Sequence, residues 1–277
     1  MKGSVLIFAK RKKAAAKEAS QRLAEWLKKK KIGVVDVSQS DGKLTEAELK
    51  GVTLGVVIGG DGTFLTLVRR LEKKDQFPLM GVNLGTLGFI TEINKEEMLA
   101  AVEEALTDKY REELRPLLQV DVWRGNKCIE SGMVFNDAVV TKDAQTTMLK
   151  FDVYVDGELL SYVRADGYIA ATPTGSTAYA LSAGGPLVHP DVNGIVLVPI
   201  MSHALSTRPT LVPRQTAIEI LLREFHGAVY LVYDGQINFE IKPGDQIKIC
   251  TSETSLRLIR SPEQKWSETV RSKLGMT

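Results

Sequence analysis

The sequence is poor in cysteine and has no long hydrophobic run. Only Cys128 and Cys250 occur in 277 residues, which excludes a disulfide framework and a cysteine metal cluster. No apolar run approaches the roughly 20 residues that span a bilayer. The apolar stretch near the N-terminus is too short for a signal peptide and no small-residue cleavage site follows it. We therefore expect a cytoplasmic protein.

Two familiar phosphate-binding motifs are also absent. The sequence has no G-x-x-x-x-G-K-[ST], which excludes a P-loop protein. It has no complete G-x-G-x-x-G after a strand, so the dinucleotide fingerprint is missing as well. The histidines His189, His203 and His226 share no metal-ligand spacing. Phosphate or metal chemistry in this chain must rest on other residues.

Charge is balanced over the whole chain and uneven along it. The net charge is +2, but residues 1–31 carry eleven Lys and Arg side chains against two acidic ones. The basic residues gather in two clusters, Lys10–Lys13 and Lys28–Lys31. Such runs are usually solvated helix faces. The alternatives are a patch that attracts polyanions and a helix at a membrane surface.

Over residues 1–115, short apolar runs alternate with helix-forming stretches. The pattern predicts strands at 4–9, 33–37, 54–58 and 79–82, and helices at 14–31, 63–71 and 95–107. Strands that alternate with helices are typical of a doubly wound, mainly parallel sheet. The first domain is therefore predicted to be α/β.

Beyond residue 115 the pattern changes to short strands separated by turns. Strands are predicted at 118–123, 127–134, 149–155, 158–163, 194–199, 216–222, 228–233, 237–241 and 246–250. Asp156-Gly157 is typical of a type I′ hairpin turn. We predict a β-sandwich domain over residues 116–255, followed by a C-terminal tail over 256–277 with helix-forming residues from 261 to 274.

The most informative stretch is Gly59-Gly60-Asp61-Gly62-Thr63, where a predicted strand meets a predicted helix. Glycines let the backbone approach a ligand, and a helix N-terminus offers N–H groups and a positive dipole end to phosphate. A carboxylate there would repel phosphate unless it binds a metal or takes a proton. The hypothesis is phosphoryl transfer with Asp61 as proton acceptor. The alternative is a plain glycine turn in which Asp61 caps the helix.

Further polar and glycine-rich segments accompany this stretch. A second glycine-spaced loop over residues 81–89 follows a predicted strand at the same edge of the sheet. The β region carries polar clusters at Asn136-Asp137, at 164–167 and at 172–186, the last with the aromatic Tyr179. Hydroxyls, amides and one ring suit a nucleoside, whereas the alternative is a turn-rich β loop.

Five segments of this chain stand in the order seen in NAD kinases, which the chain resembles over about residues 3–275. They are Gly59–Thr63, Asn83–Thr91, Asn136-Asp137, Asp166 with Thr174–Tyr179, and Asp234–Gln236. The first segment is shared with lipid kinases of a wider superfamily, whereas the set of five is specific.

The resemblance implies an α/β domain, a β-sandwich domain and a C-terminal tail that packs back on the first domain. It implies transfer of a phosphoryl group from ATP or polyphosphate to the adenosine ribose 2′-hydroxyl of NAD, which gives NADP. Mg²⁺ or another divalent cation would enter with the donor, because no dedicated metal cage is evident in the sequence. Self-association as a homodimer or homotetramer is implied, and neither nucleic acid nor a membrane is an expected partner.

The resemblance also implies roles for single residues. Asp61 resembles the family's proton acceptor, and Gly59, Gly60 and Thr63 complete the phosphate loop. Asp166 is expected to reach NAD from a neighbouring subunit. The residues expected to bind substrate are Gly62, Asn136, Asp137, Thr147, Arg164, Asp166, Thr177, Ala178, Tyr179, Ser182 and Gln236. Many members have Glu at the position of Asp137, and some have His at that of Thr147.

Two other functions stay open. A lipid kinase would use the basic N-terminal helix at a membrane, but it would leave the nucleoside-like loop without a purpose. A non-catalytic sensor of NAD or NADP would have no reason to place Asp61 beside phosphate.

Overall fold

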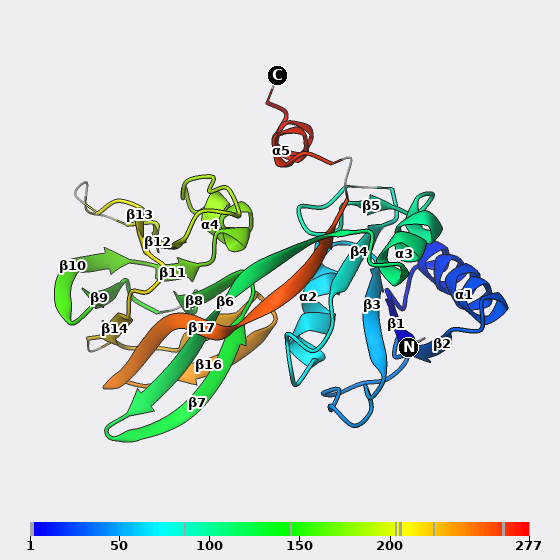
Figure 1. The fold of residues 1–277 in the computed structure, drawn as a ribbon. Coiled ribbons are helices and arrows are strands. Elements are labelled where there is room, and N and C mark those ends of the chain that lie inside the picture. Colours follow the sequence, from blue (N-terminus) through cyan, green and yellow to red (C-terminus); the bar gives the residue numbers. More distant parts are fainter. Residues whose placement is uncertain are drawn as a thin grey trace. The chain divides into compact units, whose positions relative to one another are not determined.

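The computed structural model describes residues 3–85, 87–144, 146–202, 204, 207–223, 225–261 and 264–276 (Figure 1). The chain divides into two compact units. One comprises Met1–Arg115 with Thr254–Thr277, and the other comprises Pro116–Glu253. Two long strands, β6 (Arg111–Arg124) and β17 (Asp245–Arg260), contribute residues to both units.

The first unit contains the predicted parallel sheet. Its strands are β1 (Ser4–Ala9), β2 (Gly33–Asp36), β3 (Val52–Ile58), β4 (Leu79–Asn83) and β5 (Ile93–Asn94), and its helices are α1 (Ala14–Lys29), α2 (Asp61–Arg70), α3 (Met98–Leu106) and α5 (Trp266–Leu274). The order β2-β1-β3-β4 is parallel throughout, and both β5 and the end of β17 pair parallel with β4. The return of β17 to this sheet confirms the predicted packing of the C-terminal region on the first domain.

Strands β1, β3 and β4 are almost wholly buried, as expected where helices cover both faces, whereas β2, at the edge of the sheet, is partly exposed. In α1, Leu23 and Leu27 are fully buried one turn apart, and Lys28 and Lys29 are exposed. The helix therefore shows the predicted apolar face. It ends two residues before the predicted end, because Lys31 has a positive φ of 59°, which cannot continue a helix.

The second unit is the predicted β-sandwich. Its remaining elements are β7 (Lys127–Val134), β8 (Asp137–Lys142), β9 (Leu149–Val155), β10 (Glu158–Ala165), β11 (Gly167–Ala171), β12 (Gly194–Ile200), β13 (Thr210–Pro213), β14 (Ile218–Leu222), β15 (Val229–Tyr233), β16 (Ile237–Ile241), the 3₁₀ turn η1 (Thr174–Thr177) and α4 (Tyr179–Ser182). One antiparallel sheet has the order β13-β12-β11-β8-β15-β16, and the other includes β10-β9-β14-β17 with β6 and β7. A single core cluster takes side chains from both sheets, including Phe151 and Tyr168, whose ring centroids lie 6.1 Å apart.

Three details of the β region are informative. Asp156 and Gly157 have φ values of 51° and 80°, which confirms the type I′ turn between β9 and β10. The sequence pattern did not show β11, because this strand is buried at every residue and has no period-two alternation. The predicted strand at 246–250 was too short, since β17 continues through a polar stretch to Arg260, and the tail predicted from residue 256 begins inside it.

Candidate active site

The segment Gly59–Thr63 joins β3 to α2, as the sequence predicts. Gly60 immediately precedes the helix and, as a glycine, offers no side chain to cap its first turn. A Cβ atom at Gly60 or Gly62 would meet no heavy atom within 4 Å, so both glycines border open space. This helix N-terminus, with its positive dipole end, is a candidate site for phosphate.

Asp61 is the first residue of α2, and its carboxylate is bound by the end of the second glycine loop, a name used from here on for the segment that extends to Thr91. It accepts hydrogen bonds from the backbone N–H groups of Phe89, Ile90 and Thr91, at 2.9, 3.2 and 3.0 Å. The hydroxyl of Thr91 donates a fourth, at 2.8 Å. The glycine-turn alternative assigned Asp61 a capping role, whereas these bonds make Asp61 the link between the two glycine loops.

The second loop is shaped to receive this carboxylate. A Cβ atom at Gly88 would lie 2.1 Å from Oδ1 of Asp61 and 2.3 Å from Oγ1 of Thr91, so only glycine fits there. Asn83, 1% exposed, donates to the carbonyl oxygen of Ile93 at 3.2 Å and accepts the N–H of Gly85 at 3.1 Å. Thr86 of this motif and His203 lie outside the described residues.

In the second unit, Asp234 fixes the start of β8 in a similar way. Its carboxylate accepts the backbone N–H groups of Phe135, Asn136 and Asp137, with shortest distances of 2.9, 2.7 and 3.1 Å. Its own N–H donates to the carbonyl oxygen of Asp137 at 2.9 Å. The motif Asp234–Gln236 was noticed in the sequence, but only Gln236 was assigned a role there, so this function of Asp234 was missed.

Asn136 and Asp137 are held in a largely dehydrated position. Asn136 is 8% exposed, and among the described residues its Oδ1 atom has no hydrogen-bond donor. Asp137 is 4% exposed. Burial, reinforced by the negative charge of Asp234, raises the pKa of Asp137 to about 7, while a hydrogen bond from the N–H of Tyr179 opposes the shift. A buried amide oxygen without a donor is a natural contact for a ligand hydroxyl.

The segment from Thr172 to Ser182 lies beside these residues. The hydroxyl of Thr172 donates to the carbonyl oxygen of Phe135 at 2.7 Å. A Cβ atom at Gly175 would lie 2.0 Å from the carbonyl oxygen of Asn136. The segment then forms η1 and α4, which present Tyr179, 47% exposed, and Ser182. The structure thus brings together the predicted residues Asn136, Asp137, Thr177, Ala178, Tyr179 and Ser182, with Gln236 in the turn after Asp234.

The other predicted residues of this unit lie apart from that group. Asp166 is 3.4 Å from Nζ of Lys142, which also donates to the carbonyl oxygen of Thr146, the neighbour of Thr147. Lys142 and Asp137 are the last and first residues of β8, five residues and therefore ~17 Å apart. Arg164 on β10 lies opposite Lys150 of β9, on the same hairpin that leads to Asp166. Within one chain, Thr147, Arg164 and Asp166 are therefore remote from Asp137.

The described residues contain neither a cluster of metal-binding side chains nor a membrane-spanning helix. No group of three His, Cys, Asp or Glu side chains there could hold a metal ion. No described helix is both long enough and apolar enough to cross a membrane.

Comparison with known proteins gives matches over most of the chain. A family model described as the ATP-NAD kinase N-terminal domain matches residues 43–110, and one described as the ATP-NAD kinase C-terminal domain matches residues 135–261. The NAD kinase of Solibacter usitatus is 41% identical over 275 residues, which cover 97% of this chain and 96% of that protein. The NAD kinase of Trichlorobacter lovleyi is 39% identical and covers 98% of this chain and 97% of its own.

Solved structures are similar over nearly the full length. Yeast NADH kinase in complex with NADH has a TM-score of 0.89 at 27% identity, covering 99% of this chain and 88% of that one. An NAD kinase from Archaeoglobus fulgidus in complex with ATP has a TM-score of 0.77 at 26% identity and covers 98% of each chain. Both likenesses agree with the α/β and β-sandwich architecture.

The raised pKa of Asp137 predicts a pH-dependent effect of Asp137→Asn on stability. The folded protein binds the carboxyl proton of Asp137 more tightly than the unfolded chain does. The contribution of the protonated carboxyl group to the free energy of unfolding is therefore full below about pH 4 and is lost as the pH rises towards 7. Asparagine carries no charge and escapes this loss. We expect the variant to gain on the order of 2 kcal/mol in free energy of unfolding at about pH 8 relative to wild type, and little at about pH 4.

Urea unfolding at both pH values measures this difference. Glu253→Gln, at an exposed position of the same unit, is the control and should show no such pH dependence. A stability difference for Asp137→Asn that is the same at both pH values would contradict the assignment.

Proposed function

The chain belongs to the NAD kinase family and converts NAD to NADP with ATP, and we propose that Asp61 accepts a proton in this reaction. The proton comes from the adenosine ribose 2′-hydroxyl, which attacks the terminal phosphorus of the donor. One observation carries the proposal, namely that the Asp61 carboxylate sits at the N-terminus of α2 and is bound by the second glycine loop.

The hydrogen bonds of Asp61 indicate which oxygen reacts. Oδ1 accepts three hydrogen bonds, from the N–H groups of Ile90 and Thr91 and from the Thr91 hydroxyl. Oδ2 accepts one, from the N–H of Phe89. A carboxylate oxygen has about two acceptor sites, so Oδ2 retains the capacity to take a proton. We assign the proton transfer to Oδ2, with Oδ1 serving to hold the group in place.

We propose that the glycine loops bind the donor phosphates. The phosphate loop of Gly59, Gly60, Gly62 and Thr63 would admit phosphate oxygens to the helix N-terminus, where Gly60 and Gly62 border open space. The N–H groups of Gly59 and Thr63 already donate to the carbonyl oxygens of Val82 and Gly60, at 2.9 and 2.8 Å. ATP would enter with Mg²⁺ or another divalent cation as part of the substrate, and the ion would neutralise charge as the phosphoryl group moves. Polyphosphate is the alternative donor with the same chemistry. The reaction then depends mostly on positioning.

Residues of the β-sandwich are proposed to bind NAD. Asn136 and Asp137 would contact the ribose and the base, which the buried Oδ1 of Asn136 supports. Tyr179 would lie beside a base. The contacts to NAD would be completed by Thr177, Ala178, Ser182 and Gln236. The phosphoryl donor would be bound by the α/β region over residues 1–115.

Thr147, Arg164 and Asp166 are proposed to contact NAD bound by a neighbouring subunit. The ~17 Å between the ends of β8 separates Asp166 from Asp137 within one chain, which supports action in trans. This role requires a homodimer or homotetramer, and we propose that the enzyme works as one, in the cytoplasm. Strand β10 ends its sheet among the described strands and exposes Leu160 and Tyr162, a surface suited to a second copy.

The basic cluster at 10–13 is proposed to attract the donor. The N–H of Lys10 donates to the carbonyl oxygen of Ile58 at 3.0 Å, which places the cluster at the same sheet edge as Gly59. Arg11 is engaged by Asp41 at 2.8 Å and by the carbonyl oxygen of Ser38. Lys10, Lys12 and Lys13 are exposed and would supply the attraction.

Replacing Asp61 tests the central role. We expect Asp61→Ala to lower kcat roughly 10²–10⁴-fold, because the proton acceptor is lost, while the dissociation constant for NAD changes less than about threefold. NADP formed from NAD, ATP and Mg²⁺ is read with an NADP-specific dehydrogenase, and NAD binding by calorimetry. Thr66→Ala on the same helix is the control and should leave kcat unchanged. An Asp61→Ala enzyme that keeps more than about a tenth of the wild-type kcat excludes Asp61 as the base.

Neutralising Lys10, Lys12 and Lys13 together with glutamine tests donor attraction. The KM for ATP should rise several-fold at low ionic strength and much less at about 0.5 M salt, where such charges are screened. The same change at Lys28, Lys29 and Lys31, at the other end of α1, is the matched control. If the two triple variants behave alike, the cluster at 10–13 is an ordinary solvated surface.

Replacing Leu160 and Tyr162 with lysine tests the assembly. Charge on β10 should abolish pairing with a second copy, so light scattering should give the monomer mass and kcat should fall because Asp166 acts in trans. Val192→Lys, at another exposed apolar position, should keep the wild-type mass. A fully active monomeric variant would show that Asp166 is not supplied by a neighbour.

A further inference from the structure

We propose that Glu92 and Arg260 are positioning residues, whose buried ion pair fixes the second glycine loop and, through it, the carboxylate of Asp61. The proposal rests on the catalytic role proposed for Asp61. Neither residue belongs to the five segments that carry the family resemblance, and the two stand 168 positions apart in the sequence.

The pair is bidentate and almost fully buried. Nε of Arg260 is 2.6 Å from Oε2 of Glu92, and Nη2 is 2.5 Å from Oε1. The exposed fractions are 4% for Glu92 and 8% for Arg260. A bidentate pair of this kind fixes both the distance and the relative orientation of the two side chains.

The guanidinium of Arg260 is itself held from the other side. Its Nη1 donates to Oε2 of Glu113 at 2.9 Å, and the same oxygen accepts Nη2 of Arg115 at 2.6 Å. Arg111 lies 3.2 Å from the second oxygen of Glu113. Glu113, Arg115 and Arg111 belong to β6 and Arg260 ends β17, so Glu92 is tied to two long strands.

Glu92 transmits this constraint directly to the reacting group. It follows Thr91, which gives Asp61 both its N–H at 3.0 Å and its hydroxyl at 2.8 Å. The backbone of Thr91 packs directly on that of Gly81, because a Cβ atom at residue 81 would lie 2.9 Å from the Cα atom of Thr91. A shift of Glu92 therefore displaces the donors of Asp61, and a misplacement of about 1 Å can cost about 10²-fold in rate.

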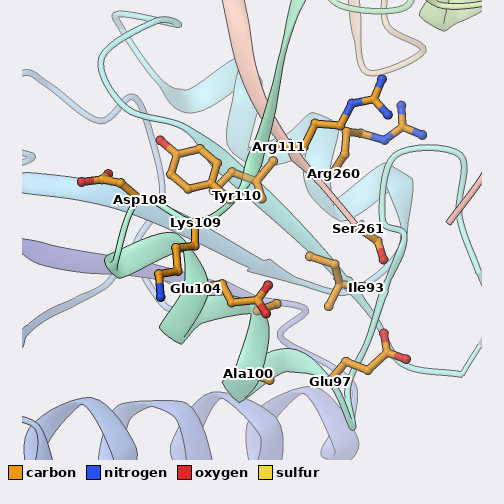
Figure 2. Close-up of a pocket in the computed structure, with 12 residues that line it drawn as sticks. Ile93, Glu97, Ala100, Glu104, Asp108, Lys109, Tyr110, Arg111, Arg260 and Ser261 are labelled. Atoms are coloured by element: carbon orange, nitrogen blue, oxygen red, sulfur yellow. The ribbon is translucent and has the colours of Figure 1, made fainter. Parts of the chain in front are cut away.

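The surroundings of Arg260 support a positioning role over a binding role. Its side chain lines a cavity of about 670 Å³ together with Ile93 and Ser261 (Figure 2). Figure 2 shows Arg260 and Arg111 at one end of the residues that line this cavity, with Glu97 and Glu104 towards the other. The charge of Arg260 is already compensated by Glu92 and Glu113, so it is not offered to a ligand in the cavity.

Stability alone does not account for the pair. Burial raises the pKa of Glu92, and the guanidinium of Arg260 opposes that shift. Because dehydrating two charges offsets most of their attraction, apolar replacement of such a pair is often neutral or stabilising. The pair lies next to the donors of Asp61, and we attribute its presence to the geometry that it imposes there.

The double variant Glu92→Met/Arg260→Met separates positioning from stability. It leaves the net charge unchanged, and Glu113 keeps Arg115 and Arg111. We expect the melting temperature to change little. The amide hydrogens of Phe89, Ile90 and Thr91 should exchange about tenfold faster or more, and kcat should fall about tenfold or more with the KM for NAD within about threefold.

The matched control is Glu112→Met/Arg257→Met. This pair is also bidentate, at 2.8 and 2.9 Å, and joins the same two strands, β6 and β17, without contacting the second glycine loop. It should leave both the exchange of the three amides and kcat at wild-type values. A control that behaves like the Glu92/Arg260 variant would show that any bidentate ion pair made by β17 matters, which overturns the proposal.

A folded Glu92/Arg260 double variant with wild-type exchange and wild-type kcat also overturns the proposal. Should that variant not fold, Arg260→Lys keeps the charge and removes the bidentate geometry. For Arg260→Lys we expect faster exchange of the same amides and a kcat lowered about threefold or more at unchanged KM, and wild-type values for both would refute the proposal. The exchange experiment needs no substrate, so its result is independent of whether wild-type enzyme forms NADP, which tests the proposed function separately.

Discussion

The proposed reaction depends on one carboxylate, that of Asp61, and on the backbone N–H groups that surround it. Asp61 stands at the start of α2, and three consecutive amides of the second glycine loop, those of Phe89, Ile90 and Thr91, donate to it. Charge-assisted bonds from a rigid backbone fix the group without loss of side-chain entropy at the moment of reaction. The two loops of the parallel sheet are thereby joined into one edge, which we propose faces the donor phosphates.

The β-sandwich contains a second carboxylate that is bound by three backbone N–H groups. Asp234 accepts three consecutive amides, those of Phe135, Asn136 and Asp137. In each unit a carboxylate therefore fixes the backbone next to a strand: Asp61 fixes residues 89–91 before β5, and Asp234 fixes residues 135–137 at the start of β8. In the first unit the carboxylate itself is the proposed reactive group, whereas in the second it holds two neighbouring polar side chains that we propose contact a ligand. Burial, reinforced by the charge of Asp234, raises the pKa of one of them, Asp137.

Local patterns were enough to predict most strands and helices of the two units, because most of them carry their own period or turn residues, whereas a strand such as β11, buried at every residue, does not. The place of Asp61 at a strand-to-helix junction was predictable for the same reason. Its hydrogen bonds to the second loop were not, since donors and acceptor lie about 30 positions apart. Glu92 and Arg260 left no local signal, and the motif at Asp234 did not reveal the role of its carboxylate, because the partners of these residues are brought to them only by the fold.

A crystal structure of the enzyme with NAD and a non-hydrolysable ATP analogue would test whether Oδ2 of Asp61 accepts the proton. We expect the adenosine ribose 2′-hydroxyl to lie about 2.6–3.2 Å from Oδ2 of Asp61, with Oδ1 still bound by Thr91. A 2′-hydroxyl that hydrogen-bonds another group, with both oxygens of Asp61 still occupied by the second glycine loop, would contradict it.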